Sequence, residues 1–176
     1  MLAARVTKLV MVASLALFAF LVTFGNITDY DANFRFVRHV LSMDTTFPDN
    51  PLAWRAITDP TLWHLGYAVI ILGEGLTCAA FTVAAVELAH NLRADAARFR
   101  RSKRFVFVGA GLGFLVWFLG FMAVGGEWFA MWQSQLWNGQ QAAFRFYATL
   151  LCVLKTREDQ ARLTPEVAAR LLGKVA

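Results

Sequence analysis

A single acidic residue stands in the middle of an otherwise apolar stretch, and its chemistry depends on that position. Glu74 lies in ILGEGLTC, eleven residues after Trp63. On a helix that rises 1.5 Å per residue, this spacing places the carboxylate roughly 16 Å into the hydrocarbon of a bilayer. Ionisable groups at such depth are usually paired or protonated, and they often mark ion or proton paths. Glu74 is therefore the first candidate for chemistry in this chain.

Two interpretations of Glu74 are open. In the structural one, Glu74 forms a buried ion pair with Arg145, which lies at comparable depth if its own helix begins near Trp137. Such a pair would fix how two helices pack, although desolvation offsets much of the attraction. In the functional one, Glu74 accepts a proton and couples a small-molecule path to proton movement. The structural interpretation is favoured, because no second acidic residue within the apolar stretches would build a relay.

The elements that must position these residues are apolar helices. The chain has 176 residues, of which 58% are hydrophobic and 16% are charged, and this composition favours a membrane protein. The expected fold is all-α, a polytopic bundle of four transmembrane helices, because about 20 apolar residues make one span. We expect a membrane domain over residues 1–156 and a cytoplasmic tail with a short amphipathic helix over 157–176. The expected spans are about 8–26, 62–89, 105–125 and 138–155.

The distribution of Lys and Arg predicts how the chain is threaded. Basic residues are concentrated near the N-terminus, between the second and third expected spans, and after Leu154. The segment from Asn26 to Leu62 has three arginines against five aspartates. Since cationic loops stay on the cytoplasmic side, both termini are expected there, with residues 26–62 outside. Within this external loop, residues 28–42 have the spacing of an amphipathic helix, lying on the membrane or across the bundle.

Tryptophans mark the expected outer membrane–water interface. The segment GGEWFAMWQSQLWNGQ, residues 125–140, holds three of the six tryptophans of the chain and a single charge. An indole at this level buries its ring and keeps its N–H in polar surroundings. We therefore expect an aromatic-walled outer surface made from both external loops. Its candidate residues are Trp54, Trp63, His64, Glu127, Trp128, Trp132 and Trp137.

Small residues recur on one face of the third expected span. Gly109, Gly113 and Gly120 share that face, and the Gly-x-x-x-Gly spacing permits close approach of another helix. We expect the face to serve helix packing inside the bundle in preference to self-association.

Several functional classes have no support in the sequence. Neither a nucleophile–base motif nor a phosphate-binding loop nor a metal signature occurs, so no catalytic residue and no metal site is predicted. The three histidines do not lie at matching depth in opposing spans, so haem is not expected and no cofactor is predicted. The basic residues fall between apolar runs, which argues against a nucleic-acid partner. The expected partners are membrane lipids and either another membrane protein or further copies of this chain.

Three strings of the sequence carry a resemblance to a known family. They are GNITDYDANFRFVRHVLSMDTTFPDN, WRAITDP and GGEWFAMWQSQLWNGQQAAFRF. Together they resemble the bacterial family of predicted small integral membrane proteins called domain of unknown function 2165, over residues 5–154. The resemblance implies a four-span protein of the bacterial inner (cytoplasmic) membrane. It implies no activity.

The sequence favours a non-catalytic accessory or assembly subunit of a larger membrane complex, because packing surfaces are abundant and chemical motifs are few. One alternative is a binder of a small molecule, a quinone or a lipid, with a pocket between the outer tryptophans and Glu74. Another is an oligomeric proton-coupled transporter that uses Glu74. A cavity that reaches Glu74 would favour binding, whereas a sealed interface with Arg145 bonded directly to it would argue against binding.

Overall fold

The architecture is all-α, as the sequence predicts. A computed structural model describes residues 2–154, and within that range every regular element is a helix. The tail predicted over 157–176, with its amphipathic helix, lies outside the described residues.

Three helices have the length and composition to cross a membrane. They are α1 (Leu2–Thr28), α3 (Pro60–His90), and a long third helix over Ala96–Trp128 that comprises α4 (Ala96–Arg101), α5 (Arg104–Phe114) and the π-helix η2 (Leu115–Trp128). The last helix, α6 (Gln140–Leu154), has 15 residues and is about 22 Å long, shorter than the roughly 30 Å hydrocarbon core. A fourth crossing by α6 stays a prediction.

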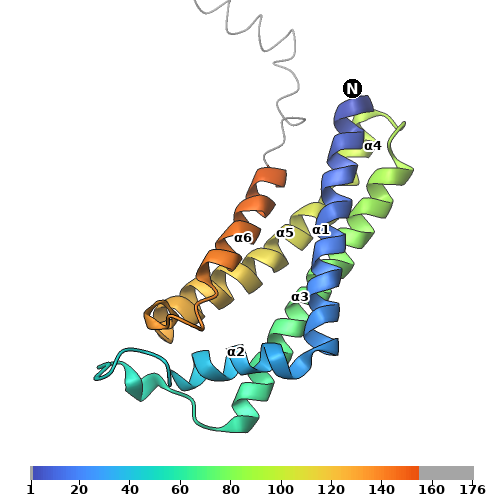
Figure 1. Ribbon diagram of the computed structural model, residues 1–176. Helices are drawn as coiled ribbons and strands as arrows, with labels where there is room; N and C mark the ends of the chain where they lie inside the picture. Colours follow the sequence, from blue (N-terminus) through green and yellow to red (C-terminus); the bar gives the residue numbers. More distant parts are fainter. Residues whose placement is uncertain (1, 155–176) are drawn as a thin grey trace, which may run out of the picture.

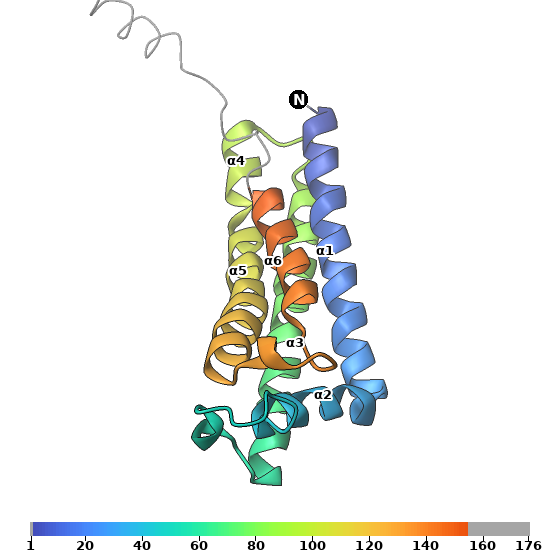
Figure 2. The ribbon, with the colours of Figure 1, turned by 60° about the vertical axis from the view of Figure 1, so that its left-hand side comes forward.

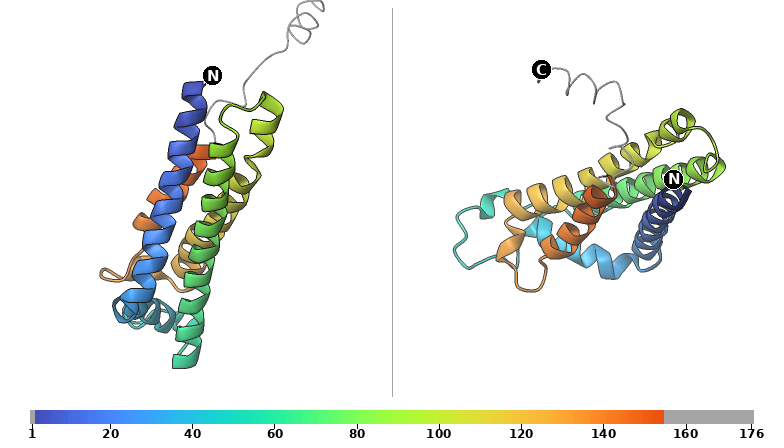
Figure 3. Two further views of the ribbon diagram at one scale, coloured as in Figure 1. Left: turned by 90° about the vertical axis from the view of Figure 1, so that its right-hand side faces the viewer. Right: turned by 90° about the horizontal axis from the view of Figure 1, so that it is seen from above.

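The long helices run beside one another, and a shorter helix crosses one end of the bundle. Figure 1 shows α2 (Tyr30–Ser42) lying across the end where α1 finishes and α3 begins. Figure 2 and Figure 3 show the N-terminus, α4 and the end of α6 together at the opposite end. Of the two positions predicted for the amphipathic helix, the structure has the one across the bundle, with Val37 and Val40 of α2 buried.

Local signals set the boundaries of these helices. The carboxylate of Asp59 accepts a hydrogen bond from Thr61 N at 2.8 Å, and Pro60 occupies the first helical position of α3. At the other boundary of this loop, α2 ends at Met43, whose φ of 54° is left-handed and turns the chain out of the helix. The segment between α2 and α3 also contains the short 3-10 helix η1 (Ala53–Arg55), and η3 (Met131–Gln133) lies in the Trp-rich segment.

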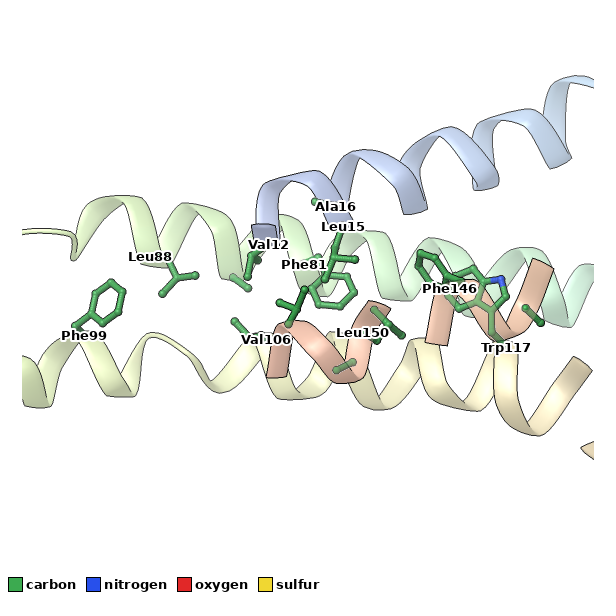
Figure 4. Packing of buried hydrophobic residues seen from close by; sticks show 14 residues of the cluster. Val12, Leu15, Ala16, Phe81, Leu88, Phe99, Val106, Trp117, Phe146 and Leu150 are labelled. Atoms are coloured by element: carbon green, nitrogen blue, oxygen red, sulfur yellow. The ribbon is translucent and has the colours of Figure 1, made fainter. Parts of the chain in front are cut away.

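The core of the bundle is a layer of aromatic and aliphatic side chains between α1, α3, α5, η2 and α6 (Figure 4). The ring centroids of Trp117 and Phe146 are 3.9 Å apart, which joins η2 to α6. Phe81 of α3 is fully buried, and a Cβ added to Gly109 would lie 2.9 Å from its ring. A Cβ on Gly113 would lie 2.7 Å from Leu150. These two glycines therefore allow α5 to approach α3 and α6 closely.

Gly120, the third glycine of the predicted face, does not take part in this packing. A Cβ built on it meets only the carbonyl of Leu115 in its own helix, at 3.7 Å. The wider π-helix begins at Leu115, so the α-helical period that aligns Gly120 with Gly109 no longer holds there.

The close approach at Gly109 can be tested against a neighbouring glycine. Gly109→Ala is expected to lower the free energy of unfolding by about 1–3 kcal/mol, because the enclosed Phe81 ring must shift. Gly111→Ala has nothing within 4 Å of the added methyl and is expected to be neutral or stabilising by up to about 1 kcal/mol. Thermal unfolding of both variants in mild detergent measures the difference. Equal melting temperatures would contradict this account of the packing.

Candidate ligand groove and buried carboxylate

Glu74 is held by an amide and not by a cation. Its side chain is 2% exposed, and Asn26 Nδ2 donates a hydrogen bond to its Oε2 at 2.7 Å. The hydroxyl of Tyr67 donates to the backbone carbonyl of Asn26 at 2.9 Å. This group, which we call the Asn26 seam, consists of Asn26, Tyr67 and Glu74 and joins the end of α1 to α3.

The predicted ion pair between Glu74 and Arg145 is not formed. Arg145 is exposed on α6, and its carbonyl accepts a hydrogen bond from Thr149. The helix begins at Gln140, later than the Trp137 start on which the prediction depended. It packs through Ala143, Phe146 and Leu150, which places Arg145 on its outer side. A neutral amide thus replaces the cation that depth alone suggested.

A line of aromatic contacts leads from the Asn26 seam to the outer surface. The rings of Tyr67 and Tyr30 lie 4.7 Å apart, and the Tyr30 hydroxyl is 2.8 Å from His64 Nδ1. His64 also stacks on Phe34 with centroids 4.1 Å apart. Of the predicted outer residues, His64 therefore belongs to this contact between α2 and α3 and not to the cluster of tryptophans.

Two segments at the end of the bundle where α3 begins meet to form what we call the outer cap, comprising α2, residues 43–59 and residues 129–139. Thr45 Oγ1 donates to Ser134 Oγ at 2.9 Å, and Phe47 N donates to Gln133 Oε1 at 3.1 Å. A small core that includes Met43, Phe129 and Met131 lies beneath these bonds. The two external segments thus fold as one layer.

Tryptophans lie in this cap and at its edge, at several separate contacts. Trp54 meets Trp128 edge-on at 6.1 Å, and the Arg55 guanidinium lies 4.5 Å from the Trp128 ring. Trp137 stacks on His39 at 4.6 Å. Trp54, His64, Glu127, Trp128 and Trp132 are exposed, whereas Trp63 and Trp137 are half-buried.

An apolar groove lies between α2, α3 and η2, beneath the outer cap. It encloses about 470 Å³. Its lining is almost wholly hydrocarbon and includes Phe36, Val40, Gly66, Val69, Gly73, Leu115, Leu119 and Gly120. Val69, Leu115 and Leu119 are about half exposed or more, so the groove is open at the surface of the bundle.

The groove is about as deep as one leaflet. Its α3 residues run from Gly66 to Gly73, three to ten residues beyond Trp63. At 1.5 Å per residue, they extend from about 4 to 15 Å beyond Trp63 along the axis of α3, and half of the hydrocarbon core is about 15 Å.

The groove and the buried carboxylate lie on different faces of α3. Gly73 lines the groove, whereas the adjacent Glu74 faces Asn26 of α1 and is not among the lining residues. The expectation of a pocket that extends from the outer tryptophans to Glu74 is therefore corrected, because the cavity stops at the neighbouring backbone. Sequence reasoning missed this groove, and it assigned Gly120, one of the lining residues, to helix packing instead.

The Asn26 seam predicts a specific pattern of stabilities. Asn26→Leu is expected to lower the free energy of unfolding by about 1–3 kcal/mol or more, because the Glu74 carboxylate then lacks its donor. Glu74→Gln is expected to change stability much less, since its carbonyl oxygen still accepts from Asn26. The double variant Asn26→Leu/Glu74→Leu is expected to recover most of the loss, because both polar partners are removed together. Thermal unfolding in detergent measures the stabilities of the single and double variants. A double variant that loses the sum of the two single losses would contradict the predicted pattern.

Comparison with known proteins identifies the family and goes no further. No curated protein and no solved structure matches the chain. The family of predicted small integral membrane proteins called DUF2165 matches residues 4–156, which cover the described helices from Ala4 of α1 to the end of α6. The family description agrees with the three helices long and apolar enough to span a membrane. The chain is therefore a member of the DUF2165 family of predicted small integral membrane proteins.

Proposed function

We propose that this protein binds a membrane lipid, with a hydrocarbon chain of the lipid in the groove between α2, α3 and η2. The observation that carries the proposal is the groove itself, which is apolar and open at the surface of the bundle beside exposed apolar residues of α3 and η2. We infer that this opening faces the hydrocarbon of one leaflet. Its volume lies within the roughly 300–1,000 Å³ of ligand pockets. An apolar lining without polar groups suits a hydrocarbon chain. Such a lining would select among hydrocarbon chains by their length and shape.

Glycines supply much of the space for this chain. Gly73 and Gly120 both line the groove, and neither brings a side chain into it. A Cβ at Gly73 would lie 2.6 Å from Val116, whereas a Cβ at Gly120 would meet only the carbonyl of Leu115 in its own helix, at 3.7 Å. The width of the groove therefore depends on a few positions without side chains.

Side chains of the outer cap can donate hydrogen bonds to the polar head of the lipid. Phe36 lines the groove and lies 6.4 Å from Trp137, whose indole stacks on His39. His39 in turn contacts Asp44, with His39 Nδ1 2.8 Å from the carboxylate. A head that emerges past Phe36 would therefore meet an indole N–H and an imidazole, both of which can donate hydrogen bonds.

The proposal includes a topology. We infer four crossings in a bacterial inner membrane, with both termini cytoplasmic, α6 being the fourth. The described part supports an even number of crossings, since the N-terminus and the end of α6 lie at the same end of the bundle (Figure 1). Lys8 Nζ of α1 donates to the carbonyl of Val153 near the end of α6.

The accessory-subunit role predicted from the sequence stays a hypothesis. Gly109 and Gly113, which could have served a partner, are used for packing within the bundle. The transporter alternative also stays a hypothesis, and it would need Glu74 to exchange its Asn26 hydrogen bond for water. Neither role has an observation in its favour comparable to the groove.

Filling the groove tests the proposal. Gly120→Leu places a side chain in the groove without a clash of its Cβ with another helix, and its backbone is not in the left-handed region. It is expected to weaken lipid retention by roughly fivefold to a hundredfold, the equivalent of about 1–3 kcal/mol of overpacking. Gly111→Leu is the matched control, because it adds the same side chain at an open position outside the groove. Mass spectrometry of lipids that remain bound after gentle extraction measures retention.

The outcomes separate the remaining hypotheses. A lipid or quinone retained by the native chain and by Gly111→Leu, but lost from Gly120→Leu, would support the groove and identify its occupant. Equal retention by all three chains would overturn the proposal. A stoichiometric protein partner that co-purifies without any retained lipid would instead favour the accessory-subunit role.

A further inference from the structure

A second hollow lies at the opposite end of the bundle from the outer cap. We call it the basic hollow, and it lies between the end of α3, α4 and the start of α5, with a volume of about 710 Å³. Its lining includes His90, Arg98, Arg100, Arg101, Arg104 and Phe107. Four arginines therefore line one hollow.

The positive charge of the basic hollow is only partly compensated. Glu87 lies in the hollow and accepts a hydrogen bond from Arg104 at 2.9 Å. The carboxylate of Asp95 lies beside Arg98 and Arg101, and the backbone N–H of Arg98, which donates to it, lowers the pKa of Asp95. Within residues 2–154, no side-chain hydrogen bond of Arg98, Arg100 or Arg101 is formed. These guanidinium groups are therefore available to an anion.

The arginines are presented on a helix that is anchored in place. Phe99 of α4 is buried, with the Arg5 guanidinium 4.5 Å from its ring. Arg5 also donates hydrogen bonds to the carbonyls of Leu92 and Ala94, at 2.8 and 2.6 Å. The carboxylate of Asp95 caps the start of α4. One face of α4 is thus fixed to the bundle while its arginines stay exposed.

The position of the basic hollow favours a lipid headgroup over a dissolved anion. Phe107 lines the hollow and is 57% exposed, at the point where the apolar part of the third long helix begins. The Arg104 guanidinium lies 4.7 Å from the ring of the adjacent Phe105. The hollow therefore combines phosphate-binding groups with an apolar edge, as a phosphodiester joined to acyl chains requires.

We propose that the basic hollow binds the phosphate headgroup of an anionic phospholipid, with Arg98 and Arg101 as its main ligands. Arginine matches phosphate oxygens with two parallel N–H donors, which a diffuse positive surface does not provide. The site is separate from the groove and lies in the other leaflet, so it does not depend on the function proposed above.

Substitutions at matched arginines test this site. Arg98→Gln and Arg101→Gln are each expected to weaken binding of cardiolipin or phosphatidylglycerol roughly fivefold, the loss of one arginine near an anionic headgroup. Arg93→Gln removes the same charge from the turn that precedes α4, at an exposed position outside the hollow, and it is expected to change binding little. Native mass spectrometry of the purified full chain, titrated with each lipid and with phosphatidylcholine, measures the affinities.

The fold of the variants and the identity of the anion need separate readouts. The cap of α4 uses the backbone N–H of Arg98, so Arg98→Gln is expected to keep the native melting temperature. If Arg93→Gln lost as much affinity for the anionic lipid, the proposed site would be overturned in favour of general attraction between charges. Inorganic phosphate that displaces cardiolipin at comparable concentration would overturn the lipid assignment in favour of a free anion. Unchanged cardiolipin affinity in Gly120→Leu is expected, and it would separate this site from the groove.

Discussion

The hydrogen bond between Asn26 and Glu74 is the interaction on which the outer half of the molecule depends. It joins the last part of α1 to α3 inside the bundle, where a carboxylate without a partner would be costly. Because α2 begins only a few residues after Asn26, the bond also sets where α2 can cross the bundle. The crossing of α2 in turn places Phe36 and Val40 over α3 and η2, and the groove lies beneath them. A buried polar contact thus determines an apolar cavity on the other face of the same helix.

The sequence predicts the helices well and their partners less well. Apolar runs locate α1, α3 and the long third helix, because each must present apolar side chains to lipid over most of its length. The tryptophans predict the outer cap, since aromatic residues with polar edges collect at the interface. Arg145 shows the limit of this reasoning. Its depth was compatible with Glu74, yet its direction depends on where α6 starts and which side of α6 packs, and composition specifies neither.

Gly120 shows a second limit, which concerns helical period. Reading three glycines as one face assumes that the period of α5 continues beyond Phe114. The π-helix that follows places more residues in each turn and rotates Gly120 away from the packed face toward the groove. The groove itself arises where α2, α3 and η2 meet and their side chains do not fill the space between them. A single sequence cannot show such a meeting, because it depends on segments far apart along the chain.

The length of α3 fixes how the protein sits in the bilayer. Trp63, whose indole donates to the Ile57 carbonyl of the outer cap, and Glu87 of the basic hollow lie on this one helix. They are 24 residues apart, which is about 36 Å along a straight axis. That distance exceeds the roughly 30 Å hydrocarbon core and falls short of the roughly 40–45 Å that includes the headgroups. The polar residues at both ends of the bundle therefore oppose movement of the protein along the membrane normal. In a thicker bilayer both polar ends can stay in the headgroup layers only if the bilayer around the protein thins. Hydrophobic mismatch would therefore deform the membrane before it tilted this helix.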